Sequence, residues 1–103
     1  MGARYNSDMA SSNDYLVYIL DLLQEAPLIH YRKMMGEYLL YQDKVLFGGL
    51  YDNRFLVKIT PSLAEEGLKQ MLPYPGAMLM YLIDAEDKTE VARLVMKVVN
   101  DLR

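Results

Sequence analysis

The stretch RKMMGEYLLYQDKVLFGGLYDNRFLVK, residues 32–58, decides the fold of this chain. It contains short apolar and aromatic segments that are separated by two turn signals, Gln42-Asp43-Lys44 and Asp52-Asn53. Each segment has the length of a β-strand and is too short to form a stable helix. The stretch therefore predicts a meander of antiparallel strands.

The segments on either side of this meander complete the predicted fold. Ser12 is a natural N-cap for a helix that runs to about Ala26, where Pro27 ends it. The other predicted elements are strands at 28–34, 37–42, 45–51, 54–59 and 78–83, and helices at 60–71 and 87–102. The order α-β-β-β-β-α-β-α predicts an α+β domain, an antiparallel sheet of about five strands with helices packed on it.

Length and composition favour one domain. The chain has 103 residues, of which 52% are hydrophobic, so one core is expected. Residues 1–11 are polar and aperiodic and predict a disordered segment ahead of a single domain at 12–103. The net charge of −3 argues against direct, sequence-specific DNA binding. Without an apolar run of ~20 residues or a signal peptide, the sequence predicts a cytoplasmic protein outside the membrane.

The chemically reactive side chains do not form a catalytic pattern. The chain has no cysteine and a single histidine, His30, which excludes Cys-ligated zinc and a multi-histidine metal site within one chain. The pair Glu65-Glu66 lies in the first turns of a predicted helix, where acidic residues are favoured for local reasons. We therefore expect no enzyme activity, no catalytic residues, no metal and no cofactor.

Basic residues in the meander suggest a binding surface. Arg54 and Lys58 share one face of a predicted strand, whereas the adjacent Arg32 and Lys33 point to opposite faces. If Arg32 joins the first pair, a basic patch covers the open side of the sheet. Such a patch is either a solvated face or a site for an acidic partner or a phosphate. The candidate binding patch is Arg32, Lys33, Glu37, Arg54 and Lys58.

The glycine pair Gly48-Gly49 suggests a second surface. Two glycines inside a strand leave room for something to approach the backbone, either a crossing helix or a partner or ligand. Little charge protects this strand from pairing with another chain. Nine tyrosines and eight methionines also suit either a core or an adaptable interface. The candidate interface, for a protein partner or a homodimer, is Phe47, Gly48, Gly49 and Leu50.

The meander also resembles the N-terminal domain of the TfoX family, bacterial regulators linked to natural competence. That family shows a helix, then Arg-Lys-Met-Phe-Gly-Glu-Tyr-Gly-Leu-Tyr, then a hairpin that ends in Leu-Lys. Met35 replaces the usual Phe and Leu39 the usual Gly, and the similarity extends over about residues 11–102. The matching residues are Arg32, Lys33, Met34, Gly36, Glu37, Tyr38, Leu40, Tyr41 and Lys58.

The resemblance implies a small α+β domain, similar to type III secretion chaperones, without catalytic residues. Longer members of the family carry a second, helical domain, and this sequence ends before such a domain. Two functions are consistent with the residues. One is a non-enzymatic regulatory or protein-interaction domain. The alternative is a small-molecule or anion-binding domain that uses the basic face of the sheet.

Overall fold

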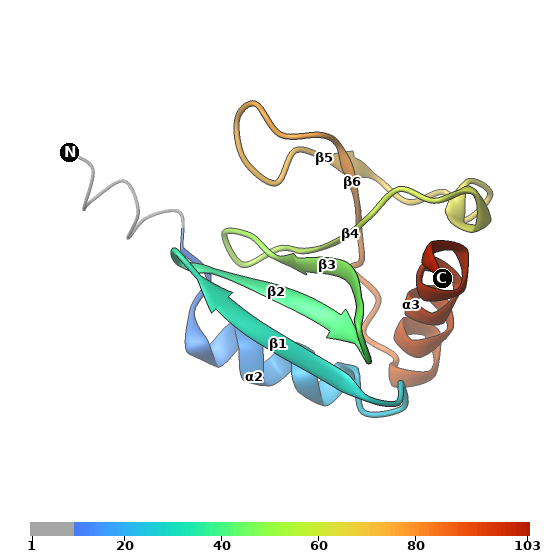
Figure 1. Ribbon diagram of the computed structural model, residues 1–103, viewed down its shortest axis with the longest axis horizontal. Helices are drawn as coiled ribbons and strands as arrows, with labels where there is room; N and C mark the ends of the chain where they lie inside the picture. Colours follow the sequence, from blue (N-terminus) through green and yellow to red (C-terminus); the bar gives the residue numbers. More distant parts are fainter. Residues whose placement is uncertain (1–9) are drawn as a thin grey trace.

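A computed structural model describes residues 10–103, which form an α+β domain, as the sequence predicts. Figure 1 shows one open sheet with two helices, α2 (Asn13–Leu22) and α3 (Lys88–Leu102). The remaining elements are β1 (Ile29–Met34), β2 (Glu37–Gln42), β3 (Val45–Leu50), β4 (Phe55–Val57), the 3₁₀ turn η1 (Pro61–Leu63), β5 (Gln70–Met71) and β6 (Met80–Leu82). None of the helices in this part of the chain is long and apolar enough to cross a membrane.

The sheet is antiparallel throughout and has the order β1-β2-β3-β4-β6-β5, so β1 and β5 form its edges. Two-residue turns join β1 to β2 and β2 to β3, because Met34 pairs with Glu37 and Gln42 pairs with Val45. In the first turn Met35 and Gly36 both have positive φ, 52° and 84°. Positive φ at both central residues marks the type I′ turn, whose twist matches that of a hairpin.

The core lies between the sheet and the two helices. Alternate residues of the central strands point toward the helices, and we call this side the helix face. Ser12 caps α2 through a 3.0 Å bond from the Tyr15 amide to the Ser12 hydroxyl, and Asp87 caps α3 in the same way. The buried residues of this core include Leu16, Ile19, Leu23, Tyr38, Leu40, Phe47, Leu50, Phe55, Val57, Tyr81, Val91, Leu94, Val95 and Val98.

The glycine pair of β3 is explained by the sheet itself. A Cβ at Gly48 would overlap the carbonyl oxygen of Leu56, and one at Gly49 would lie 2.7 Å from that of Tyr38. The groups that approach the glycines are therefore the neighbouring strands β4 and β2. The sequence had suggested a crossing helix, a partner or a ligand instead. The register also slips beside Gly48, because Leu40 pairs with Gly48 but Tyr41 pairs with Leu46, so Phe47 is an extra residue in β3.

The second half of the chain corrects two predictions. Thr60 and Pro61 do begin a helical turn, but η1 ends after three residues, so the predicted helix at 60–71 is wrong. Gly67 has a positive φ of 72°, which a continuing helix does not allow, and Gln70–Met71 instead pair with β6 as a sixth strand. The continuous apolar run 78–83 predicts a strand that is covered on both faces, but Met78 is 86% exposed and Leu79 is also exposed.

The beginning of the domain lies slightly earlier than predicted. Residues 1–9 of the predicted disordered segment lie outside the described residues, but Ser11 is buried. Its amide donates to the Gly36 carbonyl at 2.9 Å, and its hydroxyl accepts from the Asn53 amide at 3.0 Å. The Ser12 amide completes the contact by donating to Asn53 Oδ1 at 2.9 Å. Ser11 therefore belongs to the folded domain, because it joins the start of α2 to two turns of the sheet.

Candidate binding site

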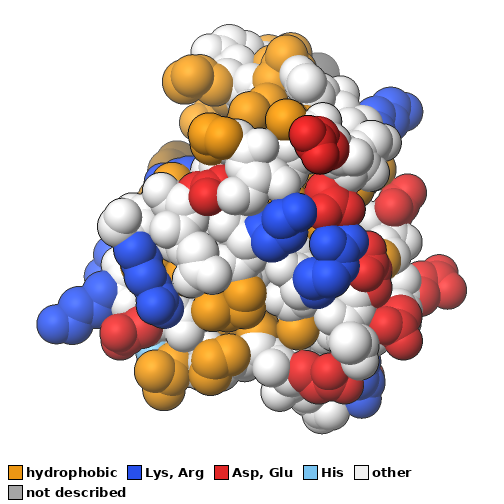
Figure 2. Space-filling model, turned by 90° about the vertical axis from the view of Figure 1, so that its right-hand side faces the viewer, with side chains coloured by type: hydrophobic (Ala, Val, Ile, Leu, Met, Phe, Trp, Pro, Cys, Tyr) orange, Lys and Arg blue, Asp and Glu red, His pale blue; other side chains and the backbone are white. Residues whose placement is uncertain are grey.

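A concave surface lies at the end of the sheet that carries β4 and β6. The loop between β5 and β6, residues 72–79, extends beyond the sheet in Figure 1 and forms one wall of an open hollow of about 530 Å³. Apolar side chains gather at the top of Figure 2, at the height where this loop lies. We call this concave surface the outer hollow. Its lining residues are Tyr51, Lys58, Ile59, Pro73, Tyr74, Gly76, Ala77, Met78, Leu79 and Met80.

Arg54 holds this loop against the sheet. Its guanidinium donates to the carbonyl oxygens of Leu72 and Pro73, both at 2.9 Å, and to that of Tyr51 at 3.0 Å. Hydrogen bonds from a charged donor are stronger than those between neutral groups, so the two bonds to Leu72 and Pro73 fix the start of the loop firmly, while the bond to Tyr51 orients the guanidinium. The sequence placed Arg54 in a partner-binding patch, whereas in the structure its guanidinium binds the chain's own backbone.

Tyr51 forms the inner wall of the hollow. Its side chain is almost fully buried, and its ring lies 6.2 Å from that of Tyr74 between centroids. Burial raises the pKa of Tyr51 to about 12, and the nearby charges of Glu37 and Tyr74 add to the effect. Burial also raises the pKa of Glu37. The Tyr51 hydroxyl therefore stays protonated at neutral pH and remains a hydrogen-bond donor.

The structure does not bring the five residues of the predicted binding patch together. Arg32 and Lys33 lie on β1, which β2 and β3 separate from β4. Lys58 lines the outer hollow, and Arg54 binds the loop. Glu37 is close enough to Tyr51 for its charge to affect the tyrosine. The basic residues therefore occupy two places, one at the edge strand and one at the hollow.

The predicted interface on β3 is wrong. Phe47 and Leu50 have no exposed surface, and both glycines are buried within the sheet. The reason is that β3 is a central strand, with β2 on one side and β4 on the other. A strand with few charges was read as an unprotected edge, but central strands also lack charges because both of their edges are already paired.

The sequence interpretation missed the residues that form the hollow, Tyr51, Tyr74, Met78 and Leu79. The signal in the sequence was the Pro-Tyr-Pro-Gly segment at 73–76, because a rigid irregular loop is a common place for binding residues. The methionines that follow it were assigned to a covered strand. Within residues 10–103, no group of three or more His, Cys, Asp or Glu side chains is placed to hold a metal ion.

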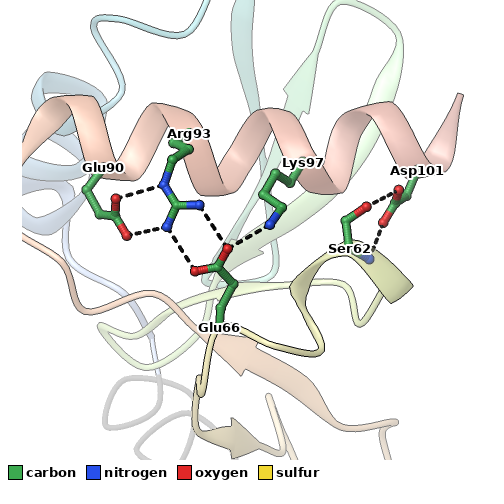
Figure 3. A network of polar contacts seen from close by, with 6 residues as sticks. All are labelled: Ser62, Glu66, Glu90, Arg93, Lys97 and Asp101. Atoms are coloured by element: carbon green, nitrogen blue, oxygen red, sulfur yellow. Dashed lines mark hydrogen bonds and ion pairs between the residues drawn. The ribbon is translucent and has the colours of Figure 1, made fainter.

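A polar network lies on α3 and serves the fold. Figure 3 shows Glu66 between Arg93 and Lys97, with nitrogen–oxygen distances of 2.8 Å to Arg93 Nη1 and 2.7 Å to Lys97 Nζ. Hydrogen bonds from Arg93 and then Lys97 lower the pKa of Glu66 to about 2. Asp101 accepts from the hydroxyl of Ser62 at 2.6 Å. The network therefore attaches η1 and the residues after it to α3.

One curated protein gives a significant match to this sequence. Over 80 residues the chain is 38% identical to a protein of Spirochaeta aurantia named "Uncharacterized 12.7 kDa protein in trpE 5'region". The match covers 74% of this chain and 68% of the relative. No protein-family model matches the chain.

Proposed function

This chain belongs to the same family as the uncharacterised Spirochaeta aurantia protein, and from that premise we propose that it is a non-enzymatic protein-interaction domain. The domain holds apolar side chains of a protein partner in the outer hollow. The observation that carries the proposal is the concentration of exposed apolar side chains around this hollow. They are Ile59, Tyr74, Met78 and Leu79.

The chemistry of the rim supports a protein partner. Met78 is unbranched and polarizable, so it adapts to different apolar surfaces. Tyr74 offers a large ring with few rotatable bonds, which costs little entropy when a partner orders it. Arg54 already fixes the backbone at the start of the loop, which lowers the cost of ordering the loop on binding.

The TfoX resemblance supports a regulatory role for the interaction. Several of its matching residues build the first hairpin, since Gly36 supplies the turn and Tyr38 and Leu40 point into the core. Lys58, at the end of the motif, lines the outer hollow. The residues that match the TfoX pattern therefore include both residues that build the fold and one residue, Lys58, of the proposed site.

Affinity capture from lysate of the native host tests this function. The tagged protein is compared with the double variant Met78→Asp/Leu79→Asp and with the control Val17→Asp, which adds charge at an exposed position on α2. We expect the unmodified protein and the control to retain the same proteins, and the double variant to lose them. Equal retention by all three proteins, with equal thermal stability, would contradict the proposal.

The size of the hollow favours a small amphipathic ligand as a second candidate function. About 530 Å³ lies within the range of small-molecule sites, and Lys58 and the Tyr51 hydroxyl supply polar groups beside an apolar wall. Native mass spectrometry of the purified protein separates the two functions. A small molecule that stays bound in the control variant Lys69→Gln, at an exposed position, but is lost in Lys58→Gln would support the ligand-binding function. An unliganded mass, together with specific capture of a protein, would support the protein-interaction function.

A further inference from the structure

The edge strand β1 presents unpaired backbone groups. It is six residues long, pairs without interruption with β2, and has no strand on its other side among residues 10–103. Because a two-residue turn follows Met34, the pair Met34–Glu37 exchanges both hydrogen bonds, and the pattern then alternates along the strand. The 2.8 Å bond from the Asp43 amide to the Leu28 carbonyl fits this alternation. The outward groups are therefore those of Ile29, Tyr31 and Lys33.

Half of the side chains of the same strand are basic. His30, Arg32 and Lys33 are exposed, and none of them forms an ion pair with an acidic group in the described part of the chain. They lie next to one another in a chain whose net charge is −3. This edge is therefore a local region of positive charge, opposite in sign to the molecule as a whole.

These charges decide which strand can pair with the edge. A second copy of β1 could pair with this edge about a two-fold axis. In the two registers with the most overlap, Arg32 would lie opposite either Arg32 or His30 of the second copy. Like charges directly opposite each other destabilise a strand pair, so the edge disfavours its own copy. An acidic strand would instead be attracted to the same basic side chains of β1.

We propose that β1 binds an extended acidic segment of a protein partner, which adds to the sheet as a further strand. The side chains of β1 define its sequence pattern. Arg32 and His30 share one face of the sheet and require acidic residues at alternate positions of the segment. The other face carries Tyr31 and Lys33, and the ring of Tyr31, which packs edge-on against Tyr38 at a centroid distance of 5.8 Å, suits an apolar residue. The segment therefore alternates acidic and apolar residues.

This site is independent of the outer hollow. β1 is the first strand in the sheet order, whereas the hollow lies at β4, β6 and the loop before β6. The backbone of β1 supplies affinity and its side chains supply selectivity, which is the general logic of strand addition. If this proposal fails, the proposal for the hollow is unaffected, and the reverse is also true.

A titration monitored by nuclear magnetic resonance tests the proposal. The probe is a blocked synthetic peptide that alternates Glu and Val, added to the isotope-labelled chain at low salt. We expect the amides of Ile29, Tyr31 and Lys33 to shift and to exchange more slowly with solvent. The amides of His30, Arg32 and Met34 already bond to β2, so their exchange should change least. No binding at millimolar peptide, or shifts centred on α3, would overturn the proposal.

Two matched controls separate strand addition from simple charge attraction. A peptide of the same sequence with methylated backbone nitrogens on one edge keeps its charge but cannot donate to β1, so it should bind about tenfold more weakly or worse. Arg32→Glu should weaken the unmodified peptide by about tenfold, whereas Lys69→Glu should not, since Lys69 lies beside β5 at the opposite edge. Equal binding of the methylated peptide, or equal loss in both protein variants, would refute strand addition.

Discussion

The helix face and the outer hollow are built on different principles. On the helix face, α2 and α3 close over side chains such as Phe47, Phe55 and Val95, which have no exposed surface. At the outer hollow, the start of a loop is held by two hydrogen bonds from Arg54, and its apolar residues Met78 and Leu79 remain in solvent. The difference shows that the helix face supplies most of the burial that stabilises the fold, whereas the hollow leaves apolar side chains exposed.

The largest effect should come from the helix face. Phe47→Ala removes a fully buried ring and should lower the free energy of unfolding by about 3–5 kcal/mol, since the cavity cannot collapse completely. Met78→Ala, in the exposed loop, should change it by less than about 0.5 kcal/mol. Urea denaturation of both variants measures the contrast. Similar losses in the two variants would mean that the loop contributes to the core.

The attachment of the loop should show an intermediate effect. Arg54→Lys keeps the charge but loses the planar geometry that reaches both loop carbonyls, so we expect a loss of about 1–3 kcal/mol. Hydrogen exchange within residues 72–79 should become faster, while exchange within α3 stays slow. The control Lys58→Arg, at the neighbouring hollow, should leave exchange in the loop unchanged. Uniformly faster exchange in Arg54→Lys would indicate global destabilisation and not local release.

A smaller effect should appear in acid. The pKa of Glu66 is lowered from 4.5 to about 2, so its ion pairs stabilise the fold above pH 4.5 and are lost as the pH falls toward 2. Glu66→Gln should therefore flatten the pH dependence of stability in this window, with little change in the position of the loop. Thermal unfolding between pH 2 and 5 measures it. An unchanged profile would show that the network in Figure 3 is not coupled to folding.

The smallest effect concerns Tyr51. Its pKa is raised from 10.0 to about 12, so the neutral phenol stabilises the fold below pH 10 and that contribution disappears as the pH rises through 12. Ultraviolet titration should show one tyrosine that ionises about two pH units later than an exposed one. Tyr51→Phe should remove this late phase. Its persistence in the variant would assign it to another buried tyrosine.

The strands were predictable from the sequence because their signal is local. Turn residues such as Asp43 and Gly36 separate short apolar segments, and both have the positive φ that such turns need. The prediction of a helix at 60–71 was wrong for a physical reason. Thr60 and Pro61 are correct signals for its start, but only the pairing of Gln70–Met71 with a strand ten residues later decides how the segment continues.

The candidate site was harder to predict because it depends on contacts between distant residues. Nothing next to Arg54 in the sequence indicates that its side chain reaches the carbonyl oxygens of Leu72 and Pro73. The burial of Tyr51 likewise depends on Gly49 and on a tyrosine in a later loop. Charge and apolar pattern identified the basic residues, but their distribution between β1 and the hollow follows from the strand order alone.

The extra residue in β3 has a consequence for how this family can evolve. Phe47 stands outside the regular register and enters the core, and Gly48 directly follows it against the Leu56 carbonyl oxygen. A mutation that deletes Phe47 would restore a regular ladder with β2, but it would remove from the core the ring that the extra residue supplies. A larger residue at position 48 would force β4 away. Relatives should therefore keep or lose the insertion and the glycine together, as one inherited unit.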